Sequence, residues 1–182
     1  MTVTGPEASG DAVVPDRKSW TWVLDRPCPD CGVDTRSVAG PEVAGMVPGI
    51  LERWHAVLLR DDVRSRPAPG TWSPLEYACH VRDAFRVFAE RFRLMAEQQD
   101  PAFPDWDQDE TARTSGYRRQ DPVEVARELT AAAAALPGRL SAVADDHWQR
   151  RGFRSDGSAF SVDSLARYFV HDPLHHLHDV RG

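Results

Sequence analysis

Residues 169–178, F-V-H-D-P-L-H-H-L-H, gather four of the seven histidines of this 182-residue chain close to its C-terminus. Residues four apart on an α-helix project from one face, so His171 and His175 come within reach of a shared ion. His178 joins that stripe, and His176 leaves it. Imidazole is the commonest protein ligand for metals such as zinc, nickel and iron, and a catalytic zinc takes three protein ligands with one position open. The stretch therefore supplies two ligands of a predicted metal site.

The same histidines would also suit a solvated helix C-terminus, where imidazolium favours the negative end of the helix dipole, or a purification tag. Tags are homopolymeric, whereas Asp172, Pro173 and Leu174 interrupt this run and an apolar stretch precedes it. The pattern therefore favours a metal site. Because Pro173 lacks a backbone N–H, a bend is predicted between the two candidate ligands.

Four segments have the apolar periodicity of amphipathic helices, and three of them open on clear N-cap residues, Ser73, Asp121 and Ser161. Pro137 is expected to kink or split the third helix. The segments span residues 43–59, 73–99, 121–143 and 161–178. They predict an all-α fold, an up-and-down four-helix bundle with an irregular N-terminal arm and a long loop between the second and third helices.

The predicted organisation is a disordered N-terminus at 1–18, an arm at 19–42 and the bundle at 43–182, because the first segment has too few apolar side chains to offset its ordering entropy. The arm contains C-P-D-C-G, in which Cys28 and Cys31 have the spacing of half a structural zinc site. The only other cysteine, Cys79, falls in a predicted helix. The sequence favours inert or locally structural thiols first, a zinc shared between two subunits second and redox chemistry last.

His80 is the natural third ligand, because it lies about two turns into the second helix on an apolar flank. Taken alone, His80 would be interpreted as a hydrogen-bonded core histidine. The presence of the His171/His175 pair favours its interpretation as a metal ligand. In the long connection at residues 100–120, Phe103 and Trp106 stand between carboxylates and predict a lid that contacts bound ligand, with an acidic surface loop as the alternative. Tyr168, one turn before His171, is a candidate catalytic hydroxyl, although the spacing also suits a packed core tyrosine.

The W-S-P-L-E-Y-A-C-H opening of the second helix and the H-x-x-x-H near the end of the fourth resemble the DinB-like (DinB/YfiT) superfamily over roughly residues 43–180. The resemblance implies a four-helix bundle that holds one divalent metal, zinc, nickel or iron, through His80, His171 and His175. Relatives include mycothiol and bacillithiol S-transferases. The C-P-D-C-G arm and the extra histidines depart from the family pattern, and the fold itself carries unrelated functions.

Composition excludes several partners. The net charge of −6 is spread along the chain without a basic stripe, which argues against nucleic acid. No apolar window is long enough for a membrane span, and no signal sequence is evident, so a cytoplasmic protein is predicted. Three cysteines without a secretion signal indicate a reducing compartment.

We therefore expect a metal-dependent thiol S-transferase, in which a low-molecular-weight thiol such as mycothiol attacks a small electrophile. A metal-dependent hydrolase and a non-catalytic metal-binding or small-molecule-binding protein are the alternatives. A homodimer is expected if Cys28 and Cys31 of two subunits share a second, structural zinc.

Overall fold

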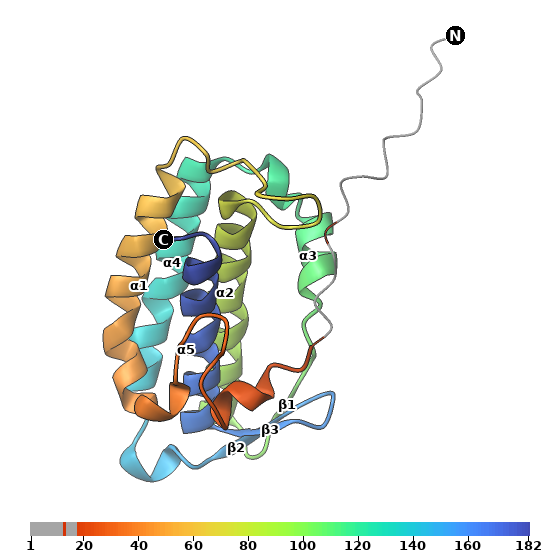
Figure 1. Ribbon diagram of the computed structural model, residues 1–182. Helices are drawn as coiled ribbons and strands as arrows, with labels where there is room; N and C mark the ends of the chain where they lie inside the picture. Colours follow the sequence, from red (N-terminus) through yellow and green to blue (C-terminus); the bar gives the residue numbers. More distant parts are fainter. Residues whose placement is uncertain (1–12, 14–17) are drawn as a thin grey trace.

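The computed structural model describes residue 13 and residues 18–182. The disorder predicted for residues 1–18 therefore concerns a segment that lies almost wholly outside the described residues. A four-helix bundle is formed by α1 (Val43–Leu58), α2 (Pro74–Glu97), α4 (Pro122–Ser141) and α5 (Val162–Asp179) (Figure 1). The short helix α3 (Gln108–Thr114) lies in the connection between α2 and α4. None of the described helices combines the length and apolar character that crossing a bilayer needs.

The bundle has one long crossover. In Figure 1, α1 and α5 run in one direction, and α2 and α4 run in the other. α4 packs between α1 and α2, and α5 completes the ring against α2 and α1. Because residues 98–121 return the chain along the bundle, α4 starts at the same end as α2. The predicted up-and-down order is therefore incorrect, and the connectivity is that of bundles with one crossover.

A small sheet closes one end of the bundle, so the all-α prediction is not exact (Figure 1). β1 (Ala102–Phe103) pairs in parallel with β2 (Arg151–Arg154), which pairs antiparallel with β3 (Ala159–Ser161). β2 and β3 form a hairpin around Asp156-Gly157, and Gly157 has the positive φ of 88° that this turn requires. Gly152 lets β2 lie against Phe103, because a Cβ there would come 2.7 Å from the phenyl ring.

The helix starts agree with the sequence. Ser73 is the N-cap of α2, as predicted: its hydroxyl accepts a hydrogen bond from the Glu76 N–H, and the Glu76 carboxylate accepts one from the Ser73 N–H at 2.8 Å, which completes a capping box. Asp121 and Ser161 cap α4 and α5 in the same positions that the sequence indicates. Pro137 lies inside α4 without splitting it, and Pro173 lies inside an unbroken α5.

The core lies between the four bundle helices. Trp54 of α1, Phe85 of α2 and Phe169 of α5 are fully buried, and the two phenyl rings meet with centroids 5.0 Å apart. The Trp54 indole N–H donates a hydrogen bond to the Pro173 carbonyl at 3.2 Å. That bond fixes α1 to the middle of α5, at the turn where the histidines begin.

A buried polar network ties α2 to the connection before α4. Arg82 donates two hydrogen bonds of 2.9 Å to Asp83, and the Tyr117 hydroxyl donates another of 2.6 Å. Arg82 also pairs with Glu128 of α4 at 2.7 Å. Burial alone would raise the pKa of the Asp83 carboxyl, but the hydrogen bonds from Arg82 and Tyr117 outweigh it and hold that pKa below its ordinary value.

We expect Asp83→Asn to lower the free energy of unfolding by about 2 kcal/mol at neutral pH, because charge-assisted hydrogen bonds are lost. A carboxyl with a depressed folded pKa stabilises the protein above its unfolded pKa of about 3.9 and loses that contribution as the pH falls toward the folded value. Urea unfolding at pH 7, 5 and 4 should show the difference from the wild type shrinking only at the lowest pH. A difference that is constant over this range would contradict the charge-based account.

Candidate metal centre

The last helix carries two pairs of ligand side chains in adjacent registers. His171 and His175 form one pair, and Asp172 and His176 form the next. Each pair has a spacing of four residues, so its members share a face of α5. Because successive residues of a helix are rotated by about 100°, the two pairs face different parts of the molecule. Each pair meets ligands from another segment.

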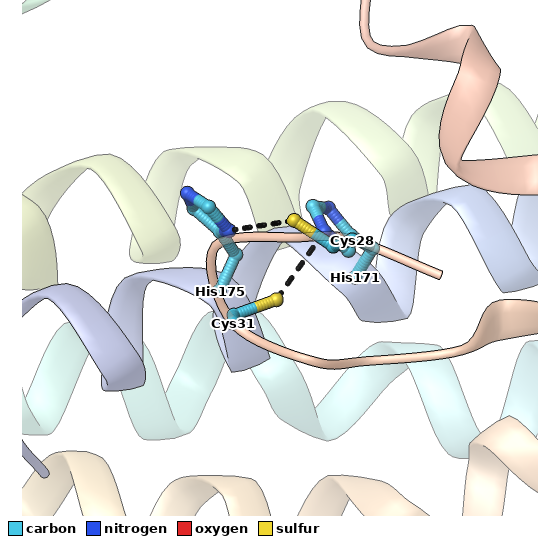
Figure 2. Close-up of side chains that lie close together, drawn as sticks. All are labelled: Cys28, Cys31, His171 and His175. Atoms are coloured by element: carbon cyan, nitrogen blue, oxygen red, sulfur yellow. Dashed lines mark hydrogen bonds between the residues drawn. The ribbon is translucent and has the colours of Figure 1, made fainter. Parts of the chain in front are cut away.

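The first pair meets the two cysteines of the N-terminal arm. Figure 2 shows Cys28 and Cys31, on the loop, pointing toward His171 and His175 on α5. The Cys28 Sγ lies 3.6 Å from the His175 Nδ1, and the Cys31 Sγ lies 3.6 Å from the His171 Nε2. One ligand atom from each of the four side chains lies within 4.8 Å of the others. We call these four residues the Cys2His2 cluster.

A tight turn presents both thiols to α5. The Cys28 N–H donates to the Val33 carbonyl at 2.9 Å, and the Gly32 N–H donates to the Cys28 carbonyl at 2.9 Å. Gly32 has a φ of 75°, a left-handed conformation that glycine adopts without strain. The turn thus closes the C-P-D-C-G loop into a compact knuckle.

The ring of Trp20 shields the two histidines of this cluster. Its centroid lies 5.7 Å from that of His171 and 5.0 Å from that of His175. Burial, followed by the charge of His175, lowers the pKa of His171 to about 4, and burial also lowers the pKa of His175. Burial raises the pKa of the Cys31 thiol to about 11. His171 is therefore neutral at pH 7, the protonation state that coordinates metals.

The second pair meets His80 of α2. The His80 Nε2 lies 3.1 Å from the Asp172 Oδ2, and the His176 Nε2 lies 3.9 Å from the same oxygen. One ligand atom from each of the three residues lies within 4.8 Å of the others. His80 is fully buried between the rings of Trp72 and Trp106, and the Trp106 ring is stacked on it at 5.1 Å. We call His80, Asp172 and His176 the His2Asp cluster.

Unpaired buried atoms indicate that the His2Asp cluster suits a cation. The Asp172 Oδ1 and the His80 Nδ1 are buried and have no hydrogen-bond partner among the described residues. Burial alone would raise the pKa of Asp172, but the charges and hydrogen bond of the neighbouring histidines, His80 first, bring it to about 2. The carboxylate is thus ionised at neutral pH. Two imidazoles and one carboxylate suit Zn²⁺ or Fe²⁺.

The Asp179 carboxylate, which belongs to neither cluster, lies close to one histidine of each. Its Oδ2 lies 2.8 Å from the His176 Nδ1 and 3.7 Å from the His175 Nε2. A carboxylate on the second nitrogen of an imidazole fixes the tautomer and the ring orientation. Asp179 is placed to do so for His176 directly.

The structure distributes the sequence-predicted ligands over both clusters. His80 lies in the His2Asp cluster, whereas His171 and His175 lie with Cys28 and Cys31. Sequence reasoning did not single out Asp172 and His176 as ligands. Their four-residue spacing repeats that of His171 and His175 one position later, and this was the available signal.

Asp172 and His176 of the His2Asp cluster line a cavity of about 1520 Å³, and so do His171 and His175 of the Cys2His2 cluster. Trp106 and Tyr168 also line this cavity. Phe103 is buried in β1, and the Arg91 guanidinium lies 5.1 Å from the centroid of its ring. Phe103 is not among the described residues that line the cavity. Burial raises the pKa of Tyr168, so its hydroxyl stays protonated and available as a donor.

Arg91 gives the cavity a buried positive charge. Its side chain is almost wholly buried, and it donates a hydrogen bond to the Pro104 carbonyl at 3.3 Å. Among the described residues, no carboxylate lies within 4.0 Å of its guanidinium. Burial, and then the charge of Arg154, lower its pKa. Arg154 lines the same cavity and pairs with Asp156. This wall of the cavity therefore favours an anionic group.

Comparisons with known proteins agree with this architecture. No curated protein matches the chain. The solved structure of YfiT from Bacillus subtilis, described as a probable metal-dependent hydrolase with an unusual four-helix bundle topology, superposes with a TM-score of 0.65 at 18% identity, over 80% of this chain and 83% of that one. That likeness concerns the fold. The sequence model of the DinB superfamily matches residues 51–180, a range that includes α2, α4, α5 and the whole His2Asp cluster, and the chain therefore belongs to the DinB superfamily.

Proposed function

We propose that the protein is a metal-dependent hydrolase that acts on a small anionic substrate. The observation that carries the proposal is the convergence of His80, Asp172 and His176, of which Asp172 and His176 line the large cavity. Two imidazoles and a carboxylate are the ligand set of several zinc hydrolases. A divalent metal held by such ligands supplies Lewis acidity, which polarises a carbonyl or phosphoryl oxygen and acidifies water.

The chain's own residues have distinct parts in this proposal. Asp179 orients His176, and the stacked Trp106 ring excludes water from one side of His80. Arg91 binds the anionic group of the substrate, because a buried guanidinium without a carboxylate partner gains most from such a ligand. Tyr168, a protonated phenol on the cavity wall, donates a hydrogen bond to the substrate.

We expect Arg91→Met to raise KM for an anionic substrate by about 10- to 100-fold, the range for one charge-assisted hydrogen-bonded contact, with a smaller change in kcat. Arg91→Lys should recover part of the loss because it restores the charge. Steady-state kinetics on a charged substrate and its neutral analogue would measure both. An equal loss for the two substrates would show that Arg91 does not recognise the charge.

The size of the cavity supports a second candidate, thiol S-transfer. Its volume of about 1520 Å³ exceeds the ordinary range for one drug-sized ligand, about 300–1000 Å³, and leaves room for a low-molecular-weight thiol beside an electrophile. Hydrolysis stands ahead of this candidate because two imidazoles and a carboxylate form the ligand set of several zinc hydrolases.

Product analysis separates the two reactions. Metal-loaded protein, made without a His-tag, would be assayed on esters, amides and phosphoesters that carry an anionic group, each with and without added thiol. Turnover with water alone, abolished by a chelator and restored by Zn²⁺ or Fe²⁺, is the result that hydrolysis predicts. Turnover that requires a thiol would establish the second candidate instead. Absence of turnover in both panels with the metal bound would overturn the enzymatic proposal.

A further inference from the structure

We propose that the Cys2His2 cluster binds a structural zinc ion within a single chain, in addition to any metal at the His2Asp cluster. The inference is independent of the proposed function, since it rests on Cys28, Cys31, His171 and His175 and on none of the residues assigned to catalysis. Two thiolates and two imidazoles form a complete ligand set for structural zinc.

The interatomic distances fit a tetrahedral ion. Zinc bonds sulfur at about 2.3 Å and nitrogen at about 2.0 Å, so a tetrahedral ion holds a sulfur and a nitrogen about 3.5 Å apart. Both observed sulfur-to-nitrogen distances, from Cys28 to His175 and from Cys31 to His171, are 3.6 Å. A sulfur-to-nitrogen hydrogen bond has a similar length, and what favours shared coordination is that ligand atoms of all four side chains lie within 4.8 Å of one another.

The surroundings favour a closed, structural site. Cys28 is 1% exposed, His171 is 4% exposed and His175 is 8% exposed, and the Trp20 ring covers both imidazoles. Cys31 is half-buried. With four protein ligands, a tetrahedral zinc has no coordination position left for a substrate.

The consequence for the molecule is a fixed N-terminal arm. The ion would join residues separated by 140 and 147 positions in the sequence, and so fasten the knuckle to α5. Fixing α5 at His171 and His175 also fixes Asp172 and His176, the residues next to them. The zinc would thereby support the geometry of the His2Asp cluster without contacting the substrate.

The closed set also decides between the alternatives for the cysteines. A zinc shared by two subunits would take two thiolates from each chain. Here His171 and His175 of the same chain already supply the third and fourth ligands. A redox pair would leave His171 and His175 without a role. Zinc within one chain accounts for all four side chains.

The test uses full-length, untagged protein and three variants, Cys31→Ser, Cys31→His and Cys79→Ala. Zinc per chain would be measured by mass spectrometry, the thermal midpoint by calorimetry and the chain mass by sedimentation. Cobalt(II) would replace zinc to reveal the thiolate-to-cobalt charge-transfer absorption. Cys79 is the matched control, because it is a buried cysteine of α2 outside both clusters.

We expect Cys31→Ser to lose one zinc equivalent and the charge-transfer absorption, with a thermal midpoint lower by about 10 °C or more. Cys31→His should retain the ion with a weaker absorption band, since it keeps a ligand at that position. Cys79→Ala should keep the zinc and the band, and the wild type should bind this zinc as a monomer. A wild type without thiolate-to-cobalt absorption, or one that loses this zinc on dissociation of a dimer, would overturn the proposal. If Cys31→Ser does not fold, the wild-type cobalt spectrum and chain mass decide alone.

Discussion

His80→Ala should remove one metal ion per chain and lower kcat/KM by about 1000-fold or more. The expected loss follows from Lewis-acid stabilisation of several kcal/mol, since about 1.4 kcal/mol corresponds to a factor of ten in rate. His80 is the only ligand of the His2Asp cluster, among the described residues, that does not belong to α5. Its loss should therefore release the ion while the Cys2His2 cluster, which contains no residue of α2, keeps its zinc.

His178→Ala is the control for this experiment, because His178 is an exposed histidine that belongs to neither cluster. It should retain both ions and full activity. Metal content and steady-state kinetics would be measured on the same preparations. A His80→Ala protein that keeps both ions, or that turns over at the wild-type rate, would refute the assignment of His80.

Trp54→Ala should lower the free energy of unfolding by about 3–5 kcal/mol, the cost of truncating a large buried aromatic residue. Trp54 is fully buried, and its indole N–H bonds to the Pro173 carbonyl in the middle of α5. The change would leave a cavity and remove the hydrogen bond that joins α1 to α5. Because Pro173 lies between the first and second member of each ligand pair, weaker metal retention by both clusters should accompany the loss of stability.

Two further variants separate the two contributions of Trp54. Trp54→Phe keeps most of the buried ring and loses the hydrogen bond, so it should cost less, about 1–2 kcal/mol. Leu59→Ala changes a residue that is 84% exposed just after α1, and it should cost less than about 0.5 kcal/mol. Urea unfolding would give all three values. Equal losses for Trp54→Ala and Leu59→Ala would contradict the packing assigned to Trp54.

The helices were predictable because their signals are local. The caps at Ser73, Asp121 and Ser161 and the hairpin at Gly157 depend on residues within one turn of each other. The path of the chain was not predictable in this way, because whether residues 98–121 return along the bundle depends on packing between distant segments. Pro137 and Pro173 were expected to disturb their helices, and tertiary packing keeps both helices unbroken.

The candidate site shows the same division between local and distant information. Helical spacing correctly indicates that His171 and His175 share a face, and it cannot say what lies opposite that face. The arm places Cys28 and Cys31 there, so His80 meets the neighbouring face, which carries Asp172 and His176. Which pair of α5 faces His80 depends on where the arm packs against α5. That contact joins residues more than a hundred positions apart in the sequence, so local patterns do not reveal it.

Anomalous diffraction from crystals of the metal-loaded protein would show whether α5 carries two metal sites in adjacent registers. We expect two peaks per chain, one surrounded by Cys28, Cys31, His171 and His175, and the other by His80, Asp172 and His176. A single peak coordinated jointly by His80, His171 and His175 would contradict it.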